Sequence, residues 1–527
     1  MQTKFYALLF DTRSIQRYIY SGNRLSTNIG ASYIVDKLFE NVLVNDVLKK
    51  IFTDDFSSVC KVEYIGGGNA LLSFKVDRRR EVVSEFTRQL LIKRPGLKVG
   101  VAYGELNLID GKLNQSDIDN LYAELKRNQN KIFPAVNVPY TGLTLSCEIN
   151  GEAANFCDVS NGEVRFYSQE AAVKFTIAEE ANEDLKQRFK KVFAENNNYK
   201  FPMKIDELGQ KDGENYFAII HVDGNNMGLK FRTCSGLSER RKLSQEIKRK
   251  VEGAFGDLLF KIIQMKKAGG FEKCLSLKDD MLPIRPLIIG GDDVTFLCPA
   301  NMAIIFTKTL MELMSAEPLH IDCCGGVAIL PTAYPFFRGY ELAEQLCDSA
   351  KKSMRLLLPS DLNDKENLTA ADIPFGSSWL DYAILHGEQA PTLEQIRAAE
   401  YRGARGNLHF GPYQVANFNS EHSQERRKNI ENLLSCASQF KNGNMAKNKV
   451  KELRGILQHG KDDTARFLRQ LHYQGQDLPD VPDWNFLKTP EFLLWTAENN
   501  SQTPYVDAIE LTDFYNAEVA KQWQNLM

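Results

Sequence analysis

Apolar and polar positions alternate along residues 214–355 in a pattern that predicts an ordered series of strands and helices. Short apolar runs bounded by turn residues are typical of strands, whereas longer segments with apolar residues three or four apart are typical of helices. The predicted strands are 216–223, 284–289, 294–298 and 321–330, and the predicted helices are 238–266, 302–314 and 339–355. The order β-α-β-β-α-β, followed by a further helix, predicts a ferredoxin-like domain.

The N-terminal part of the chain repeats this order. Its predicted strands are 5–10, 62–65, 70–74 and 98–105, with helical segments at 14–50 and 80–92. The segment Ile65-Gly66-Gly67-Gly68-Asn69 aligns with Ile289-Gly290-Gly291-Asp292-Asp293, and Gly100-Val101-Ala102 aligns with Gly326-Val327-Ala328. We therefore expect two domains of the same fold in one chain.

The rest of the chain contains no comparable strand pattern. Residues 147–211 are polar and charged, which is consistent with helices and a linker, and the chain after about 420 is helical and basic. We expect an α+β protein with four parts: a first palm-like domain at 1–145, an inter-palm segment at 146–213, a second palm domain at 214–415 and a C-terminal helical domain at 416–527. The basic run 445–454 is able to contact RNA or a protein partner, although a solvated helix face is the commoner explanation of such a run.

Composition narrows the class of protein but does not identify a ligand. The chain has 527 residues, 43% of them hydrophobic, and a formal net charge of −3. It has no apolar run of about 18 residues and no secretory signal pattern, so we expect a cytoplasmic protein with no membrane contact. Because the net charge gives no global basic field, nucleic acid would have to bind at a local patch or with help from partners.

Three carboxylates are predicted to meet at neighbouring strand ends. Gly290-Gly291-Asp292-Asp293 lies between two apolar runs and therefore at the tip of a hairpin, and Asp223 ends the first strand of the same domain. Asp223, Asp292 and Asp293 are the expected ligands of two Mg²⁺ or Mn²⁺ ions, which stabilise the attacking and leaving oxygens in nucleotidyl transfer. The alternative is that Asp292 and Asp293 only favour the turn.

Glycines and a lysine around these acids suggest a nucleotide site. Gly290 and Gly291 allow a tight turn to direct two adjacent carboxylates to one side. The segment after Asp223 is expected to wrap a triphosphate with backbone N–H groups, and Lys351 is expected to meet its β- and γ-phosphates, unless it is simply an exposed lysine. The expected nucleotide-binding residues are Gly224, Asn225, Asn226, Met227, Gly228, Gly290, Gly291 and Lys351.

The first copy of the domain lacks the paired acids. It has Gly68 and Asn69 where the second copy has Asp292 and Asp293, although Asp11 ends its first strand as Asp223 does in the second copy. Since glycine and asparagine do not supply the negative charge that holds divalent ions, we expect this domain to be catalytically inactive. It is still able to form one side of a composite pocket.

Cysteine and histidine patterns indicate no other metal chemistry. The ten cysteines include no Cys-x-x-Cys motif, and the seven histidines form no His-Asp dipeptide or His-x-x-x-His motif. A metal-dependent phosphohydrolase of the HD class is therefore not supported, and we expect no zinc. His221 alternates with apolar neighbours on the predicted strand before Asp223, which favours a core or pocket residue.

Together these motifs resemble the large subunit of type III CRISPR effector complexes, a family with paired palm domains that makes cyclic oligoadenylate from ATP. The segments that carry the resemblance are 11–19, 30–32, 223–228, 290–293, 350–351 and 448–460. The resemblance implies ATP as the substrate, and guide RNA, target RNA and other effector subunits as partners. It also implies a role in antiviral defence.

Two departures from the family pattern limit this resemblance. The sequence begins directly with the first palm-like domain, so the DNA cleavage of the family's N-terminal HD nuclease is not implied. Of the family's zinc ribbon between the palms, Cys147 and Cys157 are retained without their Cys-x-x-Cys partners, so a four-ligand zinc site is not expected.

Three functional hypotheses follow. The leading one is a nucleotidyltransferase that makes a cyclic oligonucleotide from ATP or another NTP. A diguanylate cyclase is the second, but Asp293-Val294-Thr295 lacks the Glu-Glu-Phe continuation of that family, and two fused palms replace its homodimer. The third is a non-catalytic scaffold that binds RNA and protein partners through the inactive domain and the basic C-terminal helices.

Overall fold

The computed structural model describes most of the chain and has the expected α+β class. It describes residues 2–53, 56–66, 68–109, 112–113, 115–131, 141–159, 164–211, 215–234, 236–278, 280–356, 377–387, 392–416, 426–496 and 501–526. Gly67 in the first hairpin and the predicted boundary at 213–214 lie outside the described residues.

The first unit is a five-stranded sheet with helices on both faces. Its strands are β1 (Gln2–Arg13), β2 (Cys60–Gly66), β3 (Asn69–Phe74), β4 (Lys98–Ile109) and β5 (Lys112–Leu113), in the order β2-β3-β1-β4-β5. Its helices are α1 (Ile15–Tyr20), α2 (Leu25–Lys37) with a π-helical continuation (Leu38–Leu48), α3 (Lys49–Phe52), α4 (Phe56–Val59), α5 (Arg79–Lys93) and α6 (Gln115–Gln129).

Period-two alternation along β1 explains why both faces of this sheet are covered. Leu8 and Phe10 point into the main core, which α2 and α5 also line, whereas Ala7 and Leu9 pack with α6 residues such as Leu121 on the opposite face. The strand is therefore apolar on both sides, and that gives it the continuous apolar run seen in the sequence.

The second unit repeats this arrangement with two added strands. Its sheet contains β8 (Tyr216–Gly224), β9 (Arg285–Gly290), β10 (Asp293–Pro299), β11 (Cys323–Pro331), β12 (Ser378–Ile384) and β15 (Tyr413–Ala416), in the order β15-β12-β11-β8-β10-β9. Its helices are α10 (Met227–Arg232), α11 (Leu237–Lys267), α12 (Ala303–Ser315), α13 (Phe336–Arg355) and α14 (Leu393–Glu400). In both units the fourth, first, third and second strands are neighbours in that order.

The strand register shows which residues of the two units correspond. Asp11 lies opposite Asn69 and Gly100, whereas Asp223 lies opposite Asp293 and Cys324. The alignment of the two hairpins is therefore confirmed. The alignment of Gly100-Val101-Ala102 with residues 326–328 is wrong by two positions, because Gly100 corresponds to Cys324.

The misleading similarity in this strand has a packing cause. A Cβ atom on Gly326 would lie 1.9 Å from the Ala343 carbonyl oxygen of α13, and one on Gly100 would lie 3.0 Å from Gln129 Cγ of α6. Both glycines therefore allow the following helix to approach the sheet, but they do so from different register positions.

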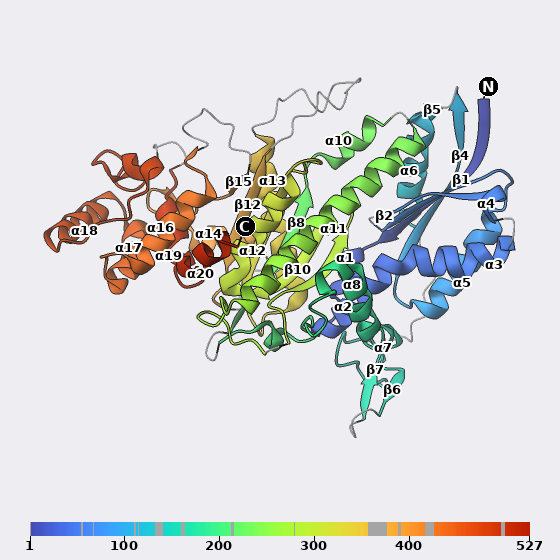
Figure 1. Cartoon of the computed structure of the whole chain (residues 1–527), viewed down its shortest axis with the longest axis horizontal. Helices are drawn as coiled ribbons and strands as arrows, with labels where there is room; N and C mark the ends of the chain where they lie inside the picture. Colours follow the sequence, from blue (N-terminus) through green and yellow to red (C-terminus); the bar gives the residue numbers. More distant parts are fainter. Residues whose placement is uncertain are drawn as a thin grey trace.

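The inter-palm segment is partly helical, as expected, but it also contains a small hairpin that the sequence did not indicate. The hairpin strands are β6 (Phe156–Asp158) and β7 (Arg165–Tyr167), and they project from one side of the molecule (Figure 1). The helices are α7 (Gln169–Thr176), α8 (Ala178–Arg188), α9 (Lys190–Phe193) and a 3-10 turn (Ile205–Leu208). Close packing of α7 on α2 requires Gly30, where a Cβ atom would lie 1.8 Å from the Lys174 carbonyl oxygen.

The C-terminal part is mainly helical, in agreement with the prediction. It contains the short strands β13 (Arg402–Gly403) and β14 (Gly406–Asn407) and then α16 (Ile430–Asn442), α17 (Lys447–His459), α18 (Lys461–Tyr473), a 3-10 segment (Pro482–Lys488), α19 (Pro504–Leu511) and α20 (Ala517–Gln524). The helices α16 to α18 lie at the opposite end of the molecule from the first sheet (Figure 1). The chain returns to the second unit at α20, where Trp523 Nε1 donates to Thr309 Oγ1 at 2.9 Å.

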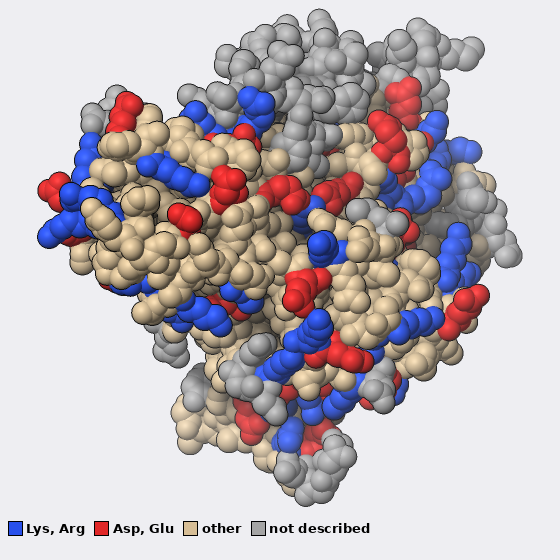
Figure 2. Space-filling view, turned by 60° about the vertical axis from the view of Figure 1, so that its left-hand side comes forward, with Lys and Arg blue, Asp and Glu red and all other residues tan. Residues whose placement is uncertain are grey.

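The molecular surface carries both signs of charge. On the face shown in Figure 2, basic and acidic side chains are interspersed between uncharged areas. This mixture is consistent with the small net charge of −3. No helix among the described residues is long and apolar enough to span a membrane.

Candidate active site

Asp223 and Asp293 are placed side by side by the central strands of the second sheet. β8 lies between β10 and β11, and its register sets Asp223 directly opposite Asp293. The turn before Asp293 contains Gly291 at φ 60°, a left-handed conformation that favours glycine. Gly290 has no such requirement, since a Cβ atom there would meet no atom within 4 Å.

The third carboxylate reaches the same place because Gly224 has no side chain. A Cβ atom on Gly224 would lie 2.8 Å from Asp292 Cβ and 2.8 Å from Met227 Cε. The absence of that atom allows the hairpin turn to pack against the end of β8. The two adjacent aspartates, on a turn and at a strand start, therefore both approach Asp223, as the sequence predicted.

Burial and the nearby charge of Asp223 make the carboxyl groups of Asp292 and Asp293 hard to ionise. Burial, followed by the nearby charge of Asp223, raises the pKa of Asp292 to about 7. Burial also raises the pKa of Asp293 well above its ordinary value, with the Asp223 charge adding to the effect and Lys351 opposing it. Acids that are costly to ionise without a counterion are characteristic of a site that receives cations.

Lys351 already provides one such counterion. Its ammonium group on α13 forms an ion pair with Asp223 Oδ2, and 18% of the lysine side chain and 28% of the aspartate side chain remain exposed. Burial lowers the pKa of Lys351, but the charge of Asp223 outweighs this effect and the pKa is raised overall. The lysine that was expected to contact phosphates therefore lies on a carboxylate in this structure.

The loop after Asp223 is shorter than the sequence suggested. Asn225 and Asn226 form the turn, Asn226 being left-handed at φ 57°, and α10 begins at Met227. Met227 is 9% exposed and packs at Gly224, whereas Gly228 is exposed in the first turn of the helix. The expected five-residue loop around a triphosphate is therefore a two-residue turn followed by a helix.

Asn225 is tied into the protein scaffold. Its backbone N–H donates to the Asp322 carbonyl oxygen at 2.7 Å, and its side-chain Nδ2 donates to the Ser377 carbonyl oxygen at 3.1 Å. The backbone N–H and the side-chain amide of Asn225 therefore both hold β8 and its turn against neighbouring segments. Only the side-chain oxygen of this buried residue lacks a hydrogen-bond partner in the described part of the chain.

Residues outside the sequence motifs complete the surroundings of the acids. His221 Nδ1 lies 3.3 Å from Asp293 Oδ1 and 3.1 Å from Thr295 Oγ1, and burial lowers its pKa. Lys230 on α10 is near Asp292 and Asp322, and burial lowers its pKa as well. His221 is two residues from Asp223 and so shares its face of the strand, a signal that the sequence did contain. Lys230 had no such signal, because the sequence predicted no helix at α10.

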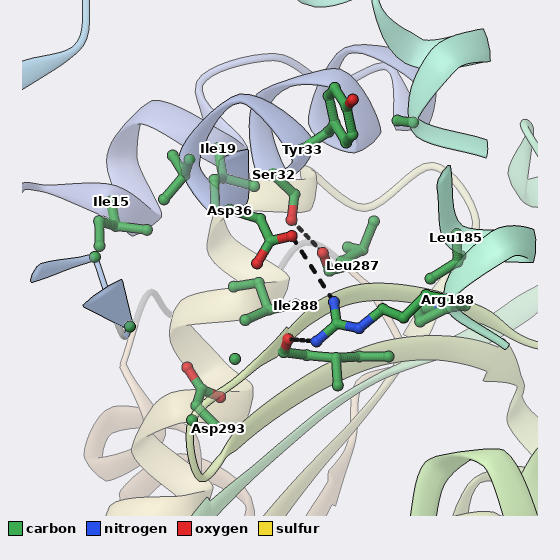
Figure 3. Close-up of a pocket in the computed structure, with 18 of the residues that line it drawn as sticks. Ile15, Ile19, Ser32, Tyr33, Asp36, Leu185, Arg188, Leu287, Ile288 and Asp293 are labelled. Atoms are coloured by element: carbon green, nitrogen blue, oxygen red, sulfur yellow. Dashed lines mark hydrogen bonds and ion pairs between the residues drawn. The ribbon is translucent and has the colours of Figure 1, made fainter. Parts of the chain in front are cut away.

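Asp292 and Asp293 border a cavity of about 350 Å³ between the two units (Figure 3). The second hairpin forms one side of the cavity, whereas α1, α2 and the tip of the first hairpin form the other. Arg188 from α8 donates to the Ile289 carbonyl oxygen at 2.5 Å and lies 3.8 Å from Asp36. The inter-palm segment therefore links the hairpin to the first unit, and the cavity is composite.

The first unit contains a neutral counterpart of the carboxylate cluster. Asp11 occupies the position of Asp223, and Asn69 lies opposite it where Asp293 would be. Gln129 on α6 donates from Nε2 to Asp11 Oδ2, which is the contact that Lys351 makes with Asp223 in the second unit. Burial raises the pKa of Asp11. Two charged positions, an acid and a lysine, are therefore neutral amides in this copy.

Other metal chemistry finds no support in the described residues. Within the described ranges, no group of three or more His, Cys, Asp or Glu side chains is arranged to hold a metal ion. This includes the three carboxylates of the second unit, which lie close together without forming a preassembled ligand shell, and Lys351 engages one of them. Cys147 is buried and Cys157 is exposed, both as free thiols. The absence of zinc remains a prediction.

Comparisons with known proteins find similarity in fold. No protein-family model and no curated protein matches the sequence. A crystal structure of Csm1 in T. onnurineus superposes with a TM-score of 0.54 and 12% identity over 97% of this chain and 70% of that chain. A crystal structure of a Csm1–Csm4 cassette in complex with pppApApA gives a TM-score of 0.51 and 11% identity over 97% and 69%. The chain has the fold of these structures, which confirms the resemblance to the type III CRISPR large subunit at the level of fold.

Proposed function

We propose that this protein is a nucleotidyltransferase that joins ATP, or another NTP, into a cyclic oligonucleotide signal in antiviral defence. The observation that carries the proposal is the convergence of Asp223, Asp292 and Asp293 at neighbouring strand ends beside a composite cavity. A simple turn-forming role does not account for it, because turn geometry alone does not require three acids to lie next to one another.

The donor set fits Mg²⁺ or Mn²⁺. Carboxylate oxygens are the hard ligands that both ions prefer. Asp293 Oδ1 is buried and has no hydrogen-bond partner among the described residues, although it lies 3.3 Å from His221 Nδ1. Asp223, Asp292 and Asp293 would hold the ions, and two bound ions would stabilise the attacking and leaving oxygens of nucleotidyl transfer.

The surrounding residues have roles that the protein performs on its own. Lys351 compensates the charge of Asp223, and the raised pKa values of Asp292 and Asp293 favour their protonated forms when no cation is bound. His221 stays neutral because it is buried, and its ring on β8 lies beside the Asp293 side chain. We infer that Gly224 and Gly291 serve the approach of the hairpin, and that Asn225, Asn226, Met227, Gly228 and Gly290 shape the wall of the site.

The fold supports the same proposal at domain level. We propose that both units are ferredoxin-like palms, at 1–145 and 214–415, joined by the segment 146–213 and followed by a helical domain at 416–527. The shared strand order and the paired hairpins favour this division. The first palm is proposed to be inactive, since Asn69 and Gln129 replace charged residues of the second.

Fold similarity suggests the substrate class and the partners. One similar structure is a Csm1–Csm4 cassette in complex with pppApApA, a linear oligoadenylate with a 5′-triphosphate. We propose by analogy that this chain binds adenine nucleotides and assembles with another effector subunit and with guide and target RNA. A purely structural subunit with the same partners is the second candidate, favoured by the neutral cluster of the first unit.

The proposal is tested by incubating purified protein with each labelled NTP and Mg²⁺ or Mn²⁺, with and without RNA. The wild type should form cyclic products, whereas Asp292→Ala combined with Asp293→Ala should reduce turnover about 100-fold or more. The matched control is Asp462→Ala combined with Asp463→Ala, since these are also adjacent aspartates but lie in the first turn of α18. An inactive wild type under all conditions would favour the structural subunit, and full turnover in the first double variant would place the chemistry elsewhere.

A further inference from the structure

A second cavity, of about 430 Å³, lies against the opposite face of α1 from the cavity at the hairpins. Ile15 and Ile19, which are four residues apart, face the hairpin cavity, whereas Arg17, Tyr18 and Ser21 line the second one. The short helix α1 is therefore a wall shared by both cavities. We call the second one the arginine cavity.

The arginine cavity gathers positive charge from four separate elements. Arg13 ends β1, Arg17 lies on α1, Arg94 follows α5 and Lys98 begins β4, and all four line the cavity. Arg13 and Lys98 are partners in the strand register, which places their backbones side by side. This concentration of cations contrasts with the net charge of −3 for the whole chain.

Two acids line the same cavity, and one of them is neutralised. Glu170 forms a buried ion pair with Lys174, whose Nζ lies 2.5 Å from Glu170 Oε1. Glu152 forms no ion pair with any described residue, and its pKa is raised by burial and by the charge of Glu170. The four cations therefore outnumber the acid charge that faces them.

Part of this positive charge is available to a ligand. In the described part of the chain, the side chains of Arg17 and Lys98 form no ion pair and no hydrogen bond, and both are exposed. Arg94 Nη1 donates at 3.0 Å to the carbonyl oxygen of Lys93, a neutral acceptor. Guanidinium groups with unused donors bind phosphate oxygens through two parallel hydrogen bonds.

The walls of the cavity are firmly packed. Tyr18 is 6% exposed, and its hydroxyl has no hydrogen-bond partner among the described residues. Gly96 has φ 83°, and a Cβ atom there would lie 1.8 Å from Glu170 Oε2, so the turn before β4 fits tightly against α7. A buried hydroxyl without a partner is costly and is relieved when a ligand supplies an acceptor.

We propose that the arginine cavity is a second ligand site, for a ligand of nucleotide size that carries two or more phosphoryl groups. Its volume falls within the range of small-molecule sites, whereas a strand of RNA needs a longer track with several stacking positions. The proposal rests on the cavity and its side chains alone and does not depend on the function proposed above.

The location gives an occupant a physical connection to the carboxylates. Tyr20 lines the arginine cavity and stacks on Tyr340 of α13 with ring centroids 4.1 Å apart. Tyr340 in turn contacts His221 at 5.6 Å between ring centroids, and His221 lies beside Asp293. A ligand that moved α1 would therefore press on residues that pack beside Asp293.

Calorimetric titration of the full chain with pyrophosphate, with ADP and with single-stranded RNA tests the site. A chelator is present throughout, so that metal-dependent binding at Asp223 and its neighbours does not contribute. The test variants are Arg17→Ala alone and Arg17→Ala combined with Arg94→Ala. Arg466→Ala combined with Arg469→Ala is the matched control, because it removes the same charge from exposed positions of α18.

We expect pyrophosphate and ADP to bind the wild type and the control equally. The single variant should weaken binding, and the double variant should weaken it about tenfold or more, since each loses a charged hydrogen-bond donor. Replacing both arginines by lysine should recover part of the affinity. The Asp292→Ala, Asp293→Ala variant should bind as the wild type does.

Three outcomes would overturn the proposal. Absence of pyrophosphate and ADP binding to the wild type would exclude the site. Binding that survives in the arginine variants but is lost in the aspartate variant would locate the ligand in the hairpin cavity. Arginine-dependent binding of RNA alone would show a surface for a polyanion instead of a site for a small ligand. Far-ultraviolet circular dichroism of each variant establishes that the fold is retained, and the exposed Arg17→Ala change alone keeps the test decisive if the double variant unfolds.

Discussion

At the scale of single residues, Asp292 shows how burial and charge are balanced at the proposed catalytic site. Burial and the neighbouring Asp223 raise its pKa to about 7, so a substantial fraction of this carboxyl group is protonated at neutral pH. Loss of that proton to form a buried anion costs free energy that a metal ion would offset. The folded protein without cations therefore carries a local strain that depends on pH.

This strain predicts a pH-dependent effect of Asp292→Asn on stability. The pKa of an unfolded aspartate is about 3.9 and that of Asp292 in the folded state is about 7, so the folded state binds more protons between these values. Stability should therefore fall as pH rises from about 4 to about 7. The variant has no carboxyl group to ionise at this position, so its stability does not fall in this way. We expect it to be more stable than the wild type by about 1–3 kcal/mol at pH 8 and nearly equal in stability at pH 4.

Urea unfolding of the two proteins across this pH range measures the difference. Added Mg²⁺ should stabilise the wild type at pH 8 and have less effect on the variant, because binding to the native state adds stability only where the ligands remain. A variant that is less stable than the wild type at pH 8 without metal would mean that Asp292 serves the turn, and that its charge causes no strain.

At the scale of elements, the two hairpins show how a duplicated unit loses its charge. In the first unit Asn69 faces Asp11 across the strands, and Gln129 supplies the neutral contact to Asp11 that Lys351 supplies to Asp223 in the second. The acid and the lysine of the second unit thus both have amide counterparts. Exchanging the acid and the lysine together for amides keeps a hydrogen-bonded arrangement and removes the need for a cation.

We therefore predict that Asn69→Ala leaves metal binding at the second hairpin intact. The change removes an amide from a cluster without cations, so it should cost about 1 kcal/mol of stability and change NTP turnover less than about twofold. Mn²⁺ binding followed by electron paramagnetic resonance gives the direct comparison, with Asp293→Ala as the variant that should lose the ion. Loss of Mn²⁺ from the Asn69 variant would place the first hairpin within the metal site.

The element order of both units could be predicted from the sequence because their strands are apolar on both faces and their turns are marked by glycine and acidic residues. The pairing of Asp223 with the second hairpin followed directly from that order. The ion pair of Lys351, the role of Gln129 and the strands β6 and β7 could not be predicted, since each depends on contacts between distant segments. The helix α10 could not be predicted for a different reason, because its six residues are too few to show a helical period.

A buried charge network joins the last strands of the second unit to the C-terminal helices. His409 Nε2 lies 3.1 Å from Asp381 Oδ1 on β12, and His409 Nδ1 lies 2.9 Å from Asp507 Oδ1 on α19. Arg397 on α14 donates to Asp381 Oδ2 at 2.6 Å. Burial lowers the pKa of His409, but the two carboxylates outweigh this effect and the pKa is raised overall.

This network predicts a pH-dependent cost for His409→Gln. Because the pKa of His409 is higher in the folded than in the unfolded state, its contribution is fully present below about pH 6.5 and is lost as pH rises through the folded value. We expect the variant to lose about 2–4 kcal/mol at pH 6 and less at pH 9. Urea unfolding at both pH values measures this loss, with exposed His459→Gln of α17 as the control. An equal loss at both pH values would mean that the imidazole acts only by packing.

At the scale of the whole molecule, one large apolar core extends through both sheets and into the C-terminal part. One cluster of buried side chains includes Phe10 of the first sheet, Phe217 and Phe306 of the second unit, and Trp484 and Trp523 of the C-terminal part. The stacking of Tyr20 on Tyr340 and the return of α20 to α12 are two of the contacts that join these parts. Segments that share one core are expected to lose it together.

The chain should therefore unfold in one transition despite its length, and its tryptophans provide the test. All four, Trp379, Trp484, Trp495 and Trp523, belong to the second unit and the C-terminal part, so their fluorescence does not report on the first unit directly. Circular dichroism in the far ultraviolet reports on helices and strands of the whole chain.

If the shared core couples the parts, the fluorescence and circular dichroism signals should change with the same midpoint in urea. Tyr20→Ala weakens the contact between the units and should separate the two midpoints. Chains of this size commonly unfold domain by domain, so coincidence is not the default outcome. A circular dichroism change in the wild type that precedes the fluorescence change would show that the first unit unfolds independently, and its packing against α13 would then contribute little to the stability of the carboxylate site.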